Sequence, residues 1–247
     1  MEEKPGAIAD MRAVTISREY GSGGGEIAVR LAKCLNWQLI DHDIVGRVAK
    51  ELGISEQEAE LRDEQAESLL SRILNSMRTI DPVLMVNAPT AAFTTDAESY
   101  RRALGKVVNA AVRRGHVVIV GRASQVLLAN RRDVLHARIV APLDMRIAYV
   151  MSREGLDQAA ARSRTQLKDR DRVRYLQGEF ESNPQDAHLY DIVVNTASLS
   201  LDQAVDLICL ALQHKAERLS VSVGELGPGA GLSAYPGQPG DFRPPQK

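Results

Sequence analysis

Cysteine and aromatic residues are scarce in this chain: its 247 residues include 2 cysteines, and only 4% are aromatic. Neither Cys34 nor Cys209 has a neighbour at the spacing of metal ligands, so the sequence offers no cysteine-based metal site. Both lie in apolar helical patterns. We therefore expect two small core residues in a reducing compartment.

An excess of charge and a long hydrophobic run are also missing. Lys and Arg total 31 against 32 for Asp and Glu, which argues against a generic polyanion binder, and we expect no nucleic-acid partner. No apolar run approaches the length that crosses a bilayer, and the start, MEEKPGAIADMR, lacks the apolar core of a signal peptide. We expect a cytoplasmic protein with no membrane partner.

What the chain does have is a glycine-rich loop between a predicted strand and a predicted helix, in the stretch AVTISREYGSGGGEIA that begins at Ala13. Its glycines permit positive φ and let backbone amides approach an anion. The following helix adds unpaired N–H groups and a positive dipole end. The candidate phosphate-binding residues are Gly21, Ser22, Gly23, Gly24, Gly25 and Glu26.

This loop resembles a P-loop, but the signature GxxxxGK[ST] is incomplete. Gly24 and Gly25 stand where Lys is expected, and Glu26 stands where Ser or Thr is expected. Taken alone, the stretch is therefore compatible with a phosphate site and with a purely structural turn.

Short apolar runs alternate with helical periodicities through most of the chain. We predict strands beginning at Ala13 and over 37–40, 116–120, 134–141 and 191–195, separated by helices. This alternation predicts an α/β fold with a five-stranded parallel sheet between two helical layers.

Four segments differ from this pattern. Residues 1–12 form an N-terminal extension, and about 55–100 is a charged helical insertion that ends in a loop over 81–96. A helix from Asp157 carries a dense arginine series in the region of about 157–180. Residues 220–247 are too rich in Gly and Pro to fold, so we predict a disordered tail after a domain over 13–219.

Five segments in this order resemble the cytidylate kinase-like family of P-loop nucleoside monophosphate kinases. They are TISREYGSGG, LIDHDIVGRV, VIVGRA, KDRDRVR and YDIVVNTASLSLDQAV, and the resemblance spans about 13–212. It implies a three-layer P-loop NTPase fold with a helical insertion that binds the nucleoside monophosphate (NMP) and a short arginine-rich lid. It also implies ATP and Mg²⁺ as cofactors, and ATP and an NMP as substrates.

The resemblance also implies roles for individual residues. Asp41 and Arg47 match positions that bind the NMP, and Arg122, after Gly121, matches an arginine that reaches the acceptor phosphate. Arg170 and Arg172 match lid arginines that close over the transferring phosphoryl group. Arginine suits these roles because phosphoryl transfer needs positioning and charge neutralisation, which guanidinium groups provide bidentately.

Each of these residues also has a structural alternative. Asp41 could cap the helix after its strand, and Arg47 could lie on a solvated helix face. Arg122 could simply end a buried strand. The run 168–174 alternates in charge and could be a solvated helix with internal ion pairs.

The chain also departs from a kinase at three positions. The P-loop lysine is missing, Gly25 replaces the arginine that the family usually has, and Val120 stands where true cytidylate kinases have an aspartate that helps to hold Mg²⁺. Arg18 could fold back as a substitute for the lysine. Glu26 could hold Mg²⁺, or it could repel the phosphates; we assign no residue as a metal ligand.

The sequence therefore predicts a phosphotransferase that moves the ATP γ-phosphoryl group to CMP, dCMP or a related acceptor. Two other classes stay open. One is a nucleotide-binding regulatory module with weak or no turnover, and the other is an interaction protein with a disused site.

Overall fold

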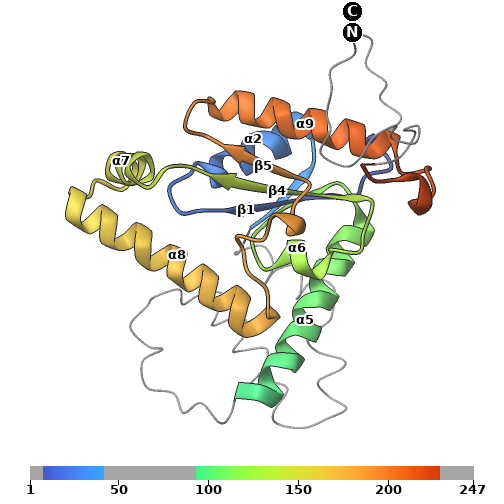
Figure 1. The fold of residues 1–247 in the computed structure, drawn as a ribbon, viewed down its shortest axis with the longest axis horizontal. Helices are drawn as coiled ribbons and strands as arrows, with labels where there is room; N and C mark the ends of the chain where they lie inside the picture. The colour runs from blue at the N-terminus through green and yellow to red at the C-terminus, as the bar shows by residue number, and fades with distance from the viewer. Residues whose placement is uncertain (1–7, 42–92, 229–247) are drawn as a thin grey trace, which may run out of the picture.

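The structure is a computed structural model that describes residues 8–41 and 93–228 (Figure 1). Five strands form one sheet, in which all neighbours are parallel and the order is β2-β3-β1-β4-β5. The strands are β1 (Ala13–Arg18), β2 (Gln38–Ile40), β3 (Val117–Val120), β4 (Val134–Val140) and β5 (Ile192–Asn195). The predicted α/β fold with a five-stranded parallel sheet is confirmed.

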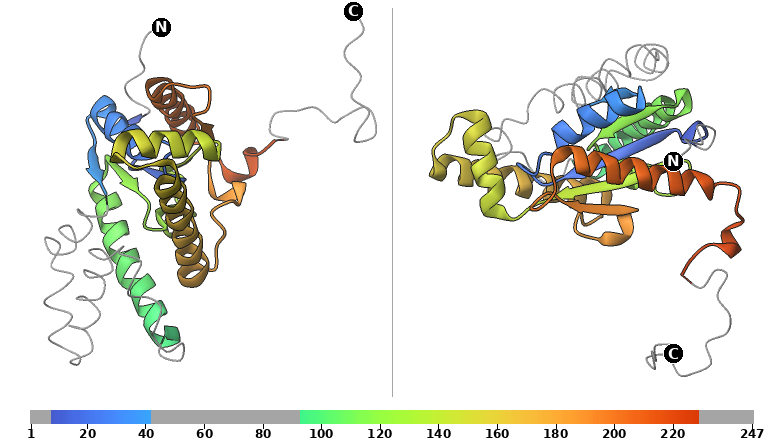
Figure 2. Two further views of the ribbon diagram at one scale, coloured as in Figure 1. Left: turned by 90° about the vertical axis from the view of Figure 1, so that its left-hand side faces the viewer. Right: turned by 90° about the horizontal axis from the view of Figure 1, so that it is seen from above.

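Helices cover both faces of the sheet (Figures 1 and 2). One face packs against α2 (Gly24–Leu35) and α9 (Leu201–Glu217), and the other against α5 (Phe93–Arg114) and α6 (Ser124–Leu127). The four residues of β3 and all but the last residue of β1 and β4 are buried, as expected for strands covered on both sides. Apolar cores on both faces therefore hold the central strands in three layers.

Two further helices lie beside the carboxyl ends of the strands. They are α7 (Leu143–Glu154) and α8 (Gln158–Phe180), which pack against each other, and α8 also contacts α5. Gly155 adopts a positive φ of 66° after α7, and the side chain of Asp157 caps α8 by accepting a hydrogen bond from the Ala160 N–H. This turn fixes the angle at which the predicted lid helix leaves α7.

Several boundaries differ from those predicted. Helix α5 already begins at Phe93, inside the predicted loop over 81–96. The sequence pattern also predicts a short helix over 123–130, but α6 has only 4 residues. The sequence predicts a last helix that opens with a capping box of Ser200 and Gln203 and ends at Leu212. The capping box is present, but α9 continues to Glu217. Short 3₁₀ helices lie at Ala187–Leu189 (η3) and Val223–Glu225 (η4).

The domain also begins and ends outside the predicted limits. Met11, from the predicted N-terminal extension, is fully buried in the core between the sheet, α2 and α9. Arg132 donates hydrogen bonds to the carbonyl groups of Arg218 and Val221, which ties the beginning of the predicted tail to the domain. Cys209 packs against the core as expected, but Cys34 is exposed, so its predicted core position was wrong.

Arg47 and most of the predicted helical insertion lie outside the described residues, so the role proposed for Arg47 stays a prediction. Over 8–41 and 93–228, no helix is both long enough and apolar enough to span a membrane.

Candidate functional site

The glycine-rich loop connects β1 to α2 at the carboxyl edge of the sheet. Gly21 and Gly23 have φ values of 80° and 79°, a region that strongly favours glycine. A Cβ at Gly21 would lie 2.7 Å from the carbonyl oxygen of Arg146, so the close approach of α7 also requires glycine. Gly23 caps α2 without a side-chain hydrogen bond, which leaves the first-turn N–H groups directed at this edge.

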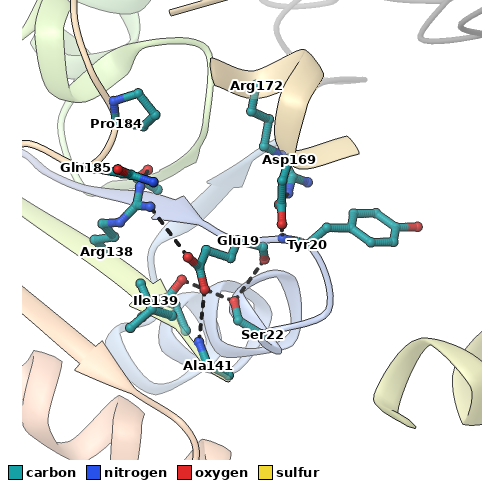
Figure 3. Close-up of polar contacts among 12 residues, drawn as sticks. Glu19, Tyr20, Ser22, Arg138, Ile139, Ala141, Asp169, Arg172, Pro184 and Gln185 are labelled. Atoms are coloured by element: carbon teal, nitrogen blue, oxygen red, sulfur yellow. Dashed lines mark hydrogen bonds and ion pairs between the residues drawn. The ribbon is translucent and has the colours of Figure 1, made fainter. Parts of the chain in front are cut away.

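Ser22 holds the loop against the neighbouring strand. Its buried hydroxyl group donates to the carbonyl oxygens of Glu19, at 2.9 Å, and Ile139, at 3.2 Å (Figure 3). Thr196, which follows β5, donates from its hydroxyl group to the Ser22 carbonyl at 3.0 Å. Ser22 therefore fixes the loop through its side chain and carbonyl group.

Arg18 is the last residue of β1, and its side chain runs across two glycines. A Cβ at Gly24 would lie 2.6 Å from the Cβ of Arg18, and a Cβ at Gly121 would meet the Arg18 guanidinium. The side chain thus passes from the amino end of α2 to the carboxyl end of β3. Arg18 occupies the space that a side chain at position 24, where the P-loop lysine is expected, would need.

Three guanidinium groups converge at this edge: those of Arg18, Arg122 and Arg172. Burial, followed by the charges of Arg172 and Arg122, lowers the pKa of Arg18 to about 9, while Asp41 acts in the opposite direction. Buried nitrogen atoms of Arg122 (Nη2) and Arg172 (Nη1) have no hydrogen-bond partner in the described structure. A buried hydrogen-bond donor without an acceptor costs free energy. A bound oxyanion would accept hydrogen bonds from these donors and would balance the positive charge of the three guanidinium groups.

Asp41 lies directly after β2 at the same edge, and its charge acts on Arg18. The structure thus brings Asp41, Arg18, Arg122 and Arg172 to one end of the sheet beside the glycine loop. Arg170 is different, because it is exposed on α8 while Arg172 faces the loop.

Helix α8 is docked on the loop through Tyr20. The Tyr20 N–H donates to Asp169 Oδ1 at 2.7 Å, and the Arg172 guanidinium carbon lies 5.3 Å from the centre of the Tyr20 ring (Figure 3). The Tyr20 hydroxyl group donates to Glu154 of α7 at 2.6 Å. Arg172 therefore already lies beside the loop without the lid movement that the sequence led us to expect.

Glu19 and two buried arginines, Arg138 and Arg146, form an ion-pair cluster next to the loop, which we call the frame. The Glu19 carboxylate accepts a hydrogen bond from the Ala141 N–H at 3.1 Å (Figure 3). It also lies 3.4 Å from Arg146 Nε. Arg138 Nη2 lies 3.9 Å from the same carboxylate. The frame joins the loop to the end of β4 and to α7.

The carboxylate of Glu26 points to α7. It lies 2.5 Å from Arg153 Nη2, and its hydrogen bond to Tyr149 contributes to raising the pKa of that phenol, after burial. No group of three or more His, Cys, Asp or Glu residues suited to a metal occurs in the described parts of the chain. Glu26 would have to leave Arg153 in order to reach a cation at the loop.

Sequence reasoning assigned no role to Tyr20, Glu19, Arg146 or Asp169. Arg146 is 7% exposed and stands next to Ile147 on an otherwise ordinary amphipathic helix, so no local pattern marks it. For Asp169 the sequence did offer a signal, the dense charge of the run KDRDRVR, but this run does not reveal which of its side chains face the loop.

The sequence was also compared with protein families and with known proteins. A model of the cytidylate kinase-like family matches residues 13–198. The chain is 28% identical over 116 residues to a cytidylate kinase of Methanopyrus kandleri, an alignment that covers 44% of this chain and 60% of that protein. It is also 36% identical over 91 residues to a uronate isomerase of Corynebacterium glutamicum, covering 37% of this chain and 18% of that protein. The chain thus spans less than two thirds of either relative.

Among solved structures, an uncharacterised protein of Eubacterium ventriosum has a similar fold. It superposes with a TM-score of 0.57 at 23% identity, covering 81% of this chain and 98% of that one. The family match spans more than half of the sequence. On these grounds the chain belongs to the cytidylate kinase-like family.

Proposed function

We propose that this chain is a nucleoside monophosphate kinase-like enzyme that transfers the ATP γ-phosphoryl group to CMP, dCMP or a related acceptor. The observation that carries the proposal is the convergence of Arg18, Arg122 and Arg172 beside the glycine loop, where buried donors of Arg122 and Arg172 have no hydrogen-bond acceptor among residues 8–41 and 93–228. Membership of the cytidylate kinase-like family supports it.

The three arginines suit the chemistry of phosphoryl transfer. Negative charge is spread over the equatorial oxygens of the transferred group, so catalysis depends on positioning and on fixed positive charge. In this proposal Arg18 replaces the missing lysine, Arg122 and Asp41 bind the acceptor, and Arg172 contacts the transferring group. We do not extend the role to Arg170, because its side chain is exposed on α8.

ATP fits the donors that the loop offers. Backbone N–H groups from Gly21 to Gly25 and the amino end of α2 would hold its phosphates, and Gly25, which is exposed, leaves room for their approach. Mg²⁺ bound to ATP would supply further charge neutralisation. Because Glu26 pairs with Arg153, oxygen ligands from phosphate and water would have to provide most of its coordination.

The direct test is a coupled ADP-release assay with each nucleoside monophosphate, performed beside calorimetric titration of ATP in the presence of Mg²⁺. Turnover with a cytidine nucleotide is the expected result. ATP binding without turnover would replace the proposal with a nucleotide-binding regulatory module, and the absence of both would leave a disused site.

The acceptor assignment has its own test in Arg122→Ala. We expect this change to weaken acceptor binding more than ATP binding, because Arg122 lies at the end of β3, across from the glycine loop. Arg113→Ala, an exposed change in the last turn of α5, is the matched control. Equal losses for both ligands, or no loss for either, would show that the acceptor assignment is wrong.

A further inference from the structure

The backbone of Tyr20 is held on both sides, through two adjacent peptide groups. Its N–H donates to Asp169 Oδ1 at 2.7 Å, and its carbonyl oxygen accepts from Arg146 Nη1 at 3.0 Å. The carbonyl group belongs to the peptide that joins Tyr20 to Gly21, where the loop turns with positive φ. Helices α7 and α8 therefore set the position from which the phosphate-binding part of the loop begins.

Asp169 is the residue that these contacts share. Its Oδ2 accepts from Arg146 Nη1 at 2.5 Å, and its Oδ1 lies 3.5 Å from Arg172 Nη1. Arg146 is itself buried and donates from Nε to the Ala141 carbonyl at 2.9 Å, so it provides a fixed point on α7. One carboxylate thus joins the loop, a buried cation and the inward-facing arginine of α8.

Arg172 depends on this arrangement for its orientation. Its contact with Asp169 is an ion pair, and Nη1 has no hydrogen-bond partner among the described residues. The Tyr20 ring supports the guanidinium from one side. Asp169 can therefore hold the arginine in place while an N–H group stays available for an oxyanion.

We propose that Asp169 is a positioning residue that latches α8 to the glycine loop and thereby holds Arg172 at the anion site before any nucleotide binds. The latch is defined by Asp169, Arg146 and the backbone N–H and carbonyl groups of Tyr20. The effect of the latch on catalysis rests on the proposed kinase function. Its effect on how firmly α8 is held to the glycine loop does not.

The test compares Asp169→Asn with Asp171→Asn. The second change also removes one negative charge from α8. Asp171 lies about 200° around the helix from Asp169 and does not contact the backbone of Tyr20. In nucleotide-free protein we expect the amides of Tyr20 and of residues 168–176 to exchange hydrogen at least about tenfold faster in Asp169→Asn than in wild type. Asp171→Asn should match wild type.

In an active enzyme, Asp169→Asn should also lower kcat at least about tenfold while the KM for ATP changes less than about threefold, since Arg172 acts mainly in the transition state. An active Asp169→Asn variant with unchanged kcat would overturn the positioning role. So would a lower Tm without faster exchange at Tyr20 and residues 168–176. If wild type has no turnover with any acceptor, the kinase proposal fails and the exchange experiment still decides the latch.

Asp169→Asn removes the nearer of the two carboxylates that pair with the buried Arg146, the other being Glu19, and this variant could fail to fold for that reason. The double change Arg146→Met and Asp169→Asn removes both charges and keeps a side chain of similar length. It should fold and should show the same faster exchange at Tyr20 and residues 168–176. Wild-type exchange in the folded double variant would overturn the latch.

Discussion

The Cβ atom that Gly24 lacks would lie 2.6 Å from the Cβ of Arg18. This distance is too short for two carbon atoms that are not bonded, so only one of these positions can carry a side chain as the chain is folded. With Gly23 as the second glycine of the P-loop signature, the first glycine would fall at position 18 and the lysine at position 24. The positive side chain that lies beside this loop in the described structure, that of Arg18, therefore extends from the strand end and not from the helix start.

This exchange of positions predicts that Gly24→Lys alone is harmful. The added side chain should cost about 1–3 kcal/mol of the free energy of unfolding, as overpacking does elsewhere, and should weaken ATP binding by displacing Arg18. The double change Arg18→Gly with Gly24→Lys should recover both properties, because it restores the usual arrangement. Chemical denaturation and ATP titration of the two single variants and the double variant give the coupling energy. Additive effects would show that the two positions do not share one space.

Gly25 allows a cleaner test of phosphate binding than Gly23. A Cβ at Gly25 meets no atom within 4 Å, whereas one at Gly23 would lie 2.6 Å from a Leu201 methyl group, at a φ of 79°. We expect Gly25→Arg to tighten ATP binding by about 1 kcal/mol, roughly fivefold in Kd, and Gly25→Glu to weaken it similarly. Gly25→Ala is the control for the change in backbone freedom. Calorimetric titration with all three variants checks this; equal affinities would place the phosphates elsewhere.

The sequence was sufficient to predict most of the fold because its signals are local. Buried β-branched runs such as 117–120, and caps such as Ser200 with Gln203, act within a few residues and appear as expected. The site was less predictable because its contacts join distant segments. Asp169 and Tyr20 are 149 residues apart, and Arg146 stands on α7 with no feature that distinguishes it from a surface arginine.

The arginine series illustrates the same limit. In KDRDRVR, charges occupy nearly every position, so no apolar stripe indicates which side of the helix is buried. The structure turns Arg172 toward Tyr20 and leaves Arg170 exposed. Only the packing of α8 against α7 and the loop separates two residues that the sequence treated alike.

The buried imidazole of His136 should make the protein less stable in mild acid. This residue of β4 is 6% exposed, its Nδ1 lies 2.8 Å from the Thr15 hydroxyl oxygen, and burial lowers its pKa from 6.5 to about 4. Between these two pKa values the unfolded chain binds more protons than the folded one, so stability is full above about pH 6.5 and falls as the pH decreases toward 4. The loss is on the order of 3 kcal/mol. Urea unfolding at pH 7 and pH 4 should show this loss in wild type, and His136→Asn should lack it.

The last prediction separates the two candidate lid arginines. Arg172 lies against Tyr20 and has a buried N–H group without a hydrogen-bond partner in the described part of the chain. Burial lowers the pKa of Arg172, and Asp169 opposes this shift. A charge held in this way is available to a developing anion, so Arg172→Ala should reduce kcat by a factor on the order of 10² to 10⁵ with a smaller change in KM. Arg170→Ala removes an exposed charge from the same helix and should change kcat by less than about threefold. Steady-state kinetics on both variants, with Tm as a check on folding, provide the comparison. If both variants lost kcat equally, α8 would have to move to present both arginines to the phosphoryl group. If both variants kept the wild-type kcat, neither arginine would take part in catalysis.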